Sequence, residues 1–372
     1  MDEVSESKGG LRNRGPAVVV CIVALLIVAW LVFPWPGKTK QLQPWAGFST
    51  PVAASSLSAT SMLPFASEPI KAGENQVYCP TMALAWAEMK SALPDFTLPD
   101  SNFAKQIETV NFTVGDIDAS DIRIVSGRPS DESVNRALSE LGIESNPIGP
   151  PGPEVEYQAI CALKKDLPFL RRFEPFDNPL RFKTDSDTIS VRSFGVTSEW
   201  EKWESALQQI EVLDYRSPEN FIIRIRNQAK DSLILARMDQ PESVEEGLGQ
   251  IKQKIATTDI EADGAAVVSG EQVVIPVLEF NMLEDYTARI CQGQAGCSIE
   301  TKQLIQFRFD EKGAQLVSVA AGGYLNGHYE HKVGERTFIF DGPFMLVLSE
   351  SNLSAPYFAA WIANGDFMTP NQ

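Results

Sequence analysis

The pattern of apolar and polar positions predicts a chain of many strands and a few helices. Alternation of the two classes predicts a strand at 304–310, and nearly continuous apolar runs predict strands at 338–348, which has an internal proline, and at 357–362. Two more apolar runs, 221–226 and 232–238, are separated by only five residues. This short separation is typical of a hairpin.

One buried helix is predicted ahead of these strands. Apolar residues recur at helical spacing from Met82 to Leu93, and Pro80 stands where a first helical turn accepts proline. A second helix is predicted to begin after Asp239, and the apolar run 273–286 predicts a further strand. Both strands and helices are predicted, and we expect a fold of the α+β class.

A long segment without regular periodicity joins the strands at 304–310 and 338–348. From Ala314 to Tyr329 it contains neither a charged residue nor a proline.

The N-terminal region contains one segment that matches a membrane span. Residues 16–35 are almost wholly apolar, and no charge occurs between Arg14 and Lys38. This is about the ~20 residues that cross the hydrocarbon core, and Trp30 and Trp35 suit an aromatic belt at the interface. A cleaved secretory signal is the alternative, but its apolar stretch is usually shorter and small residues follow it.

These features predict a single-pass protein whose main domain is extracytoplasmic. The expected organisation is a cytoplasmic tail at 1–15, a transmembrane anchor at 16–35 that contacts the lipid bilayer, a linker rich in Pro, Ser and Ala at 36–72, and a folded domain at 73–372. Basic residues on both sides of the anchor give only a weak bias in orientation, which points to an N-terminus inside the cell.

Composition and charge exclude several functional classes. The 372 residues include 49 acidic and 32 basic ones, and the net charge of −17 would repel a phosphate backbone, so no nucleic-acid partner is expected. The two histidines, His328 and His331, both lie in the long loop, where a catalytic base would stand on a mobile connection. No enzyme activity, metal site or cofactor is predicted.

The order of these elements resembles the C-terminal part of the serpins. The most specific match is Phe340-Asp-Gly-Pro-Phe344, and Phe280 and Tyr286 match another strand of the family in spacing. The resemblance covers about residues 155–368 and is poor over 94–154. Near the start of the domain Pro80 matches the family, whereas Cys79 replaces the usual serine.

The resemblance implies a divergent, shortened serpin-like fold with large, mostly antiparallel sheets and packed helices. It also implies that the long loop is a reactive loop, which a serine- or cysteine-type endopeptidase on a surface or in the secreted fraction would attack. After attack the loop would insert into a sheet and trap the enzyme. The implied hinge residues are Glu311, Gly313, Ala314, Leu316 and Ser318, and the implied region of the cleaved bond contains Tyr324, Leu325, Gly327 and His328.

A non-inhibitory role in binding or structure is the alternative for the same fold. Inhibitory members usually have very small hinge residues, whereas Leu316, Val317 and Val319 are bulky or β-branched here. The resemblance also aligns Gly327 with the residue before the scissile bond of the family. Glycine has no side chain for a protease specificity pocket to bind.

The cysteines suggest two disulfides. Cys291 and Cys297 flank a short glycine-containing segment, which predicts a local disulfide outside the cytoplasm. The resemblance places Cys79 and Cys161 near each other beneath the large sheet. We therefore expect either a Cys79–Cys161 bridge that opposes sheet opening or two buried, unpaired thiols.

Overall fold

The computed structural model describes one compact unit within residues 48–372. Residues 1–47 and 371–372 are outside the described part, as are the internal positions 49, 96–97, 99, 129–131, 144–154, 156, 198–205, 259–264, 269, 292–299, 317–335, 351–352 and 354. The predicted tail and anchor, 1–15 and 16–35, thus lie outside the described residues. Among the helices that are described, none combines the length and the apolar character that a bilayer span requires.

The first of the two large sheets contains the beginning of the long loop. Its five strands, in spatial order, are β1 (Val52–Ala53), β13 (Leu278–Asp285), β14 (Lys302–Asp310), β15 (Gly313–Leu316) and β6 (Lys165–Pro168). Every pairing in it is antiparallel except the one between β1 and β13. The strand β15 lies between β14 and β6.

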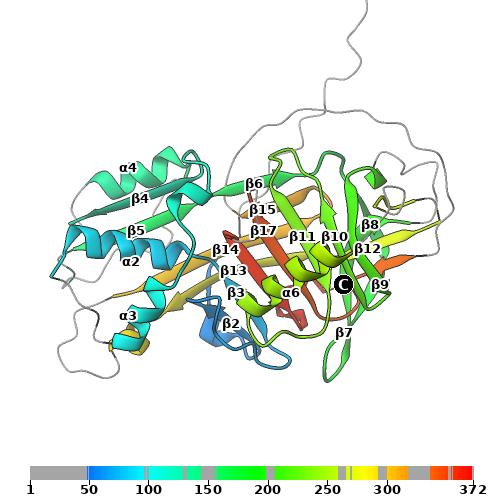
Figure 1. Cartoon of the computed structure of the whole chain (residues 1–372), viewed down its shortest axis with the longest axis horizontal. Coiled ribbons are helices and arrows are strands. Elements are labelled where there is room, and N and C mark those ends of the chain that lie inside the picture. The colour runs from blue at the N-terminus through cyan, green and yellow to red at the C-terminus, as the bar shows by residue number, and fades with distance from the viewer. Residues whose placement is uncertain are drawn as a thin grey trace, which may run out of the picture. The chain divides into compact units, whose positions relative to one another are not determined.

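The second large sheet has seven strands and crosses the first (Figure 1). In spatial order they are β2 (Thr60–Leu63), β3 (Asn75–Tyr78), β18 (Phe358–Ile362), β17 (Phe344–Ser349), β11 (Ser232–Arg237), β10 (Asn220–Ile225) and β9 (Ile210–Ser217). The central strands β11, β17 and β18 are buried along nearly their whole length. Their almost unbroken apolar sequences follow from this burial on both faces.

Two smaller sheets complete the described strands. The four-stranded sheet contains β16 (Thr337–Ile339), β12 (Gln272–Pro276), β8 (Thr188–Val196) and β7 (Glu174–Lys183). The two-stranded sheet contains β4 (Ile122–Gly127) and β5 (Gln158–Leu163). Since β5 and β6 are separated only by Lys164, one run of chain leaves the two-stranded sheet and enters the five-stranded one.

Helices are few and cover the outer surfaces of the sheets (Figure 1). They are α2 (Thr81–Ala92), α3 (Ser101–Glu108), α4 (Glu132–Glu140), α6 (Val244–Thr257) and α7 (Thr287–Cys291), with 3-10 turns η1 (Ala54–Ser56), η2 (Val114–Asp116) and η4 (Gly365–Phe367). The side chain of Ser243 caps α6 by accepting from the Glu246 N–H. This helix buries Val244, Leu248 and Ile251 against the outer face of the seven-stranded sheet.

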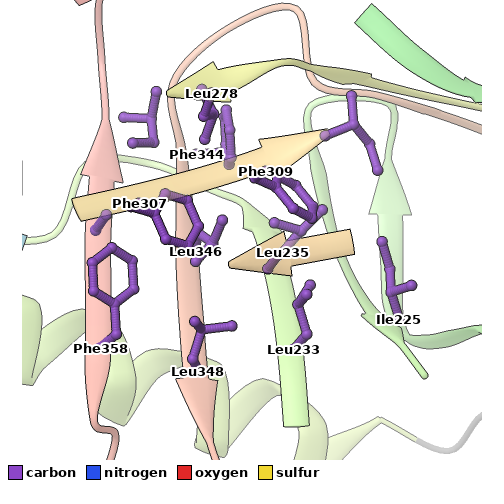
Figure 2. Close-up of a cluster of buried hydrophobic side chains, with 14 of the residues drawn as sticks. Ile225, Leu233, Leu235, Leu278, Phe307, Phe309, Phe344, Leu346, Leu348 and Phe358 are labelled. Carbon is purple, nitrogen blue, oxygen red and sulfur yellow. The ribbon is translucent and has the colours of Figure 1, made fainter. Parts of the chain in front are cut away.

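The main core lies between the two large sheets. Figure 2 shows Phe307 and Phe309 of β14 facing Leu346, Leu348 and other apolar side chains of the seven-stranded sheet. The rings of Phe307 and Phe358 stack with their centroids 4.7 Å apart. Burial of these rings supplies much of the free energy that holds the sheets together, at about 25 cal/mol for each Å² removed from water.

Most predicted elements are present, but two apolar runs and the start of the loop differ from the prediction. The hairpin is formed by β10 and β11, and the first buried helix is α2, with Met82 and Trp86 buried. The run 338–348 was predicted as one strand, but β16 and β17 belong to different sheets. The run 273–286 is likewise divided between β12 and β13. The loop prediction is also wrong at its start, because residues 313–316 form β15.

The predicted linker at 36–72 extends too far into the folded domain. Within it, β1 pairs with β13, β2 pairs with β3, and Met62 and Leu63 are buried. These strands contain many small and polar residues, so the periodicity of apolar residues does not predict them. Backbone pairing at a sheet edge needs few large side chains. The folded domain therefore begins by Phe48 rather than at residue 73.

Candidate functional site

The candidate site is the start of the long loop and the sheet that receives it. The strand β15 pairs with β14 through Arg308↔Gln315 and Phe309↔Ala314. On its other edge it pairs with β6, from Gly313↔Pro168 to Leu316↔Lys165. Four loop residues are therefore already part of the sheet.

The side chains of β15 alternate between the core and the outer face of the sheet. Ala314 is fully buried and Leu316 is 4% exposed, whereas Gln315 between them is half-buried. The inward side chains join the main core between the large sheets. The remaining hinge position, Ser318, lies outside the described residues.

Gly313 is required at the turn into β15. Its φ of +150° is a value that L-residues rarely adopt. An added Cβ would lie 2.3 Å from the carbonyl oxygen of Leu167 and 2.8 Å from the Cα of Pro168, both backbone atoms of β6. The absence of a side chain at Gly313 thus lets the two strands approach.

We expect Gly313→Ala to separate the start of β15 from β6. The clash with backbone cannot be relieved by a side-chain rotation, so the variant should lose about 1–3 kcal/mol of unfolding free energy. Hydrogen exchange should accelerate in residues 313–316. Exchange at wild-type rates there would contradict the proposed close contact.

An ion pair fixes the turn between β14 and β15. Glu311 is 7% exposed, and its Oε1 accepts from Arg172 Nη2 at 2.5 Å. The N–H of Phe173 donates to the Glu311 carbonyl at 2.9 Å, and the N–H of Phe169 donates to the Lys312 carbonyl at 2.9 Å. The predicted hinge residue Glu311 is therefore held to the chain that follows β6.

Asp310 titrates near neutrality in the same turn. Burial and the neighbouring Glu311 raise its pKa to about 6, although the Lys312 N–H, Lys312 and Arg308 each lower it. Because the folded state binds this proton more tightly than the unfolded state, the contribution of Asp310 to stability is present below pH 3.8 and is lost as pH rises through 6.

We expect Asp310→Asn to stabilise the protein at neutral pH. Asparagine keeps an oxygen that accepts from the Lys312 N–H, now 2.8 Å from Asp310 Oδ1, and it removes the buried charge. After discounting for solvent screening, the gain should be about 1 kcal/mol at pH 7 and should vanish below pH 4. Urea denaturation at several pH values measures it. An equal effect at pH 4 and pH 7 would contradict the assignment.

A buried cluster of charges lies where β15 ends. Lys165, opposite Leu316, is 3% exposed, and its Nζ lies 2.7 Å from Asp121 Oδ2, 3.1 Å from Asp231 Oδ2 and 2.5 Å from Glu350 Oε1. Tyr357 also donates to Asp231 Oδ2 at 2.7 Å. We call these five residues the Lys165 cluster. It joins β6 of the first large sheet to the ends of the central strands β11, β17 and β18 of the second.

The charge state of the Lys165 cluster follows from burial and pairing. Burial opposes the positive charge of Lys165, but hydrogen bonds to Asp121 and Glu350 raise its pKa above the ordinary value. Burial also raises the pKa of Asp231, against the lowering effect of Lys165 and Tyr357. Lys165 therefore stays charged.

The far end of the loop is anchored by Arg336. This guanidinium makes two hydrogen bonds to Glu271, of 2.6 and 3.1 Å, and a third to the carbonyl of Ala266 at 2.8 Å. It also lies over the rings of Tyr215 and Phe338. Glu271 is 1% exposed, so this is a buried, bidentate pair.

Among the described residues, part of the receiving sheet has an unfilled edge. The first half of β14, 302–306, pairs with β13 on one side, while β15 covers only 308–310 on the other. At the corresponding level, β5 pairs with β4 and turns away from β14 (Figure 1).

The cysteine predictions have different outcomes. Cys79 and Cys161 are free thiols, so the predicted bridge between them is wrong. Burial raises the pKa of both, and each remains a protonated, apolar group. Cys291 is disulfide-bonded. Its predicted partner, Cys297, lies outside the described residues, as do Tyr324, Leu325, Gly327 and His328 of the expected cleavage region.

Apart from Glu311, the sequence did not reveal the charged residues that hold the loop. Lys165 is the first residue of β6, and its partners lie up to 185 residues away. Arg172 and Arg336 are only two of many basic residues in the sequence. Within the described residues, no group of three or more His, Cys, Asp or Glu side chains forms a metal site.

Comparisons with known proteins give similarity in structure alone. No protein-family model matches the chain, and no curated protein matches it. Solved structures that resemble it include Serpin48 of the insect Tenebrio molitor, at 14% identity over 79% of this chain and 92% of that chain, with a TM-score of 0.42. Human kallistatin matches at 11% identity over 78% of this chain and 92% of that chain, with a TM-score of 0.44.

Human thyroxine-binding globulin, in complex with its hormone, matches at 10% identity over 78% of this chain and 92% of that chain, with a TM-score of 0.44. All three structures have TM-scores below 0.5 and sequence identities below 25%. Their scores give this chain no function. The function proposed below rests on the residues and strand pairings of the chain itself.

Proposed function

We propose that the chain is a membrane-tethered, extracytoplasmic inhibitor of serine- or cysteine-type endopeptidases. In this proposal the loop at 317–335 is the bait, and the five-stranded sheet is the trap. The observation that carries it is β15, four loop residues already inserted between β14 and β6. The apolar segment 16–35 supports the tether.

The existing register specifies how more of the loop would enter. If β15 were extended, Ser318 would come between Ile305 and Leu163, and Ala320 would come between Gln303 and Cys161. Both positions are small and uncharged, and both would face the core as Ala314 and Leu316 do. Insertion would turn unpaired backbone of β14 and β5 into a hydrogen-bonded ladder.

Insertion requires a cut because both ends of the loop are held. The N-terminal end is held by β15 and Glu311, and the C-terminal end by Arg336 and β16. When the protease serine or cysteine attacks a loop carbonyl, the acyl-enzyme forms and the new amine leaves with the C-terminal part. The acylated N-terminal part is then free to move into the sheet.

A binding protein without inhibitory activity is the second candidate function. The observation that favours it is that the inserted residues include bulky Leu316, whose side chain already packs in the core. A loop that is stable in this position without a cut would present 317–335 as a fixed surface. The two functions differ in what happens after cleavage.

Incubation with a panel of endopeptidases tests the proposal. The full-length protein in detergent is mixed with serine and cysteine enzymes and separated by SDS electrophoresis. A covalent adduct that contains protease and the N-terminal part supports inhibition. Complete cleavage without an adduct for every enzyme, together with an unchanged melting temperature, would leave the binding function as the better one.

A further inference from the structure

The segment that follows the predicted anchor contacts both large sheets. We call Phe48 and residues 50–63 the strap. Its β1 pairs with the outer edge of β13, through Val52↔Met282 and Ala53↔Leu283. Its β2 pairs with β3 at the edge of the seven-stranded sheet. Only residues 54–59 lie between these two strands, so the strap links the edges of both sheets through a short stretch of chain.

The start of the strap also contacts the strand beside the inserted loop. The guanidinium Cζ of Arg308 lies 5.1 Å from the centroid of the Phe48 ring, within the range of a cation–π contact. Arg308 forms an ion pair with Glu279 of β13 at 2.5 Å, and it stands opposite Gln315 of β15. A movement of β14 relative to the strap would therefore disturb the contact between Arg308 and Phe48.

The first half of the strap, Phe48 and residues 50–57, is held less strongly than the second half, residues 58–63. In the second half, Met62 and Leu63 are buried, and the side chain of Asn364 donates to the Ala59 carbonyl at 2.7 Å. In the first half, β1 has two residue pairs and Val52 is 44% exposed. The first half can thus detach while the second half keeps its place.

We propose that residues 48–57 restrain β13 and β14 and so limit how much of the loop enters the sheet. To admit Ser318 and the residues after it, β14 must move relative to β5, and β13 moves with it because the two strands share eight residue pairs. The strap opposes this movement by holding β13 to the seven-stranded sheet. This inference rests on the proposed function, since it describes the regulation of loop insertion.

Two variants of the full-length protein weaken the first half of the strap. Phe48→Ala removes the ring that Arg308 contacts, and the double variant Val52→Gly and Ala53→Gly weakens β1. Val114→Gly is the matched control, because Val114 is similarly exposed, at 46%, and lies outside the strap. Hydrogen exchange of β13 and β14 is measured first, and the rate of loop insertion after cleavage is measured second.

In each strap variant we expect hydrogen exchange in β13 and β14 to become about 5-fold faster, and the rate of loop insertion to rise by the same factor. The control variant should change neither rate. Exchange that stays at the wild-type rate would overturn the proposal, as would faster exchange with an unchanged insertion rate. If the cleaved wild-type protein never inserts its loop, the proposed function fails. In that case the exchange rates alone still decide whether the strap restrains β13 and β14.

Discussion

Cleavage of the loop between residues 324 and 332 is expected to raise the melting temperature of the protein by roughly 10 °C or more. Each backbone hydrogen bond gained contributes about 0.5–1.5 kcal/mol, and several would form along β14 and β5. Calorimetry before and after limited proteolysis measures the change. If the cleaved loop does not insert into the sheet, the melting temperature should stay unchanged.

Two substitutions separate insertion from cleavage. Ser318→Arg places a charge at a position that would face the core, whereas Val317→Arg places the same charge at the neighbouring position, which would face outward. The cleaved Ser318→Arg protein should show no rise in melting temperature. The cleaved Val317→Arg protein should behave as wild type. Equal behaviour of the two variants would show that the register of β15 does not continue.

The second large effect is expected at the Lys165 cluster. Lys165→Met removes the cation between Asp121 and Asp231 and leaves both carboxylates buried. Loss of one partner from a buried ion pair costs about 3–5 kcal/mol, which is a large fraction of the free energy of unfolding of an ordinary domain. Urea denaturation at pH 7 measures the loss.

The neighbouring lysine provides the control for this prediction. Lys164 is half-buried and donates to the carbonyl of Gly142, without a carboxylate partner in that bond. Lys164→Met should change the unfolding free energy by less than about 1 kcal/mol. If Lys165→Met does not fold, the addition of Asp121→Asn should restore soluble protein by removing one uncompensated charge. Lys165→Met as stable as Lys164→Met would contradict the charge assignment.

The sequence predicted those parts of the fold that depend on local signals. The hairpin β10–β11 and the helix α2 follow from periodicity and turn length alone. The run 338–348 was predicted as one strand because its apolar residues are nearly continuous, and an apolar run does not reveal which sheet buries it. The strap was missed for the opposite reason, since β1 and β2 contain few large apolar side chains.

The hinge residues were named from the family resemblance, whereas the residues that support them were not. Ala314 and Leu316 are buried and Gln315 between them is half-buried, but their role as a hinge stays a prediction. The pairs Arg172–Glu311 and Arg336–Glu271 join residues 139 and 65 positions apart, and no spacing in the sequence connects them. Only the folded sheets bring such groups together.

The central position of β17 and β18 has a practical consequence. A protease that cuts the loop produces a short C-terminal peptide, but that peptide includes two interior strands flanked by β11 and β3. Extracting it would mean unfolding the seven-stranded sheet. A nicked molecule should therefore migrate as one particle in native gels and release no fragment into solution, and only denaturing conditions would reveal that it had been cut.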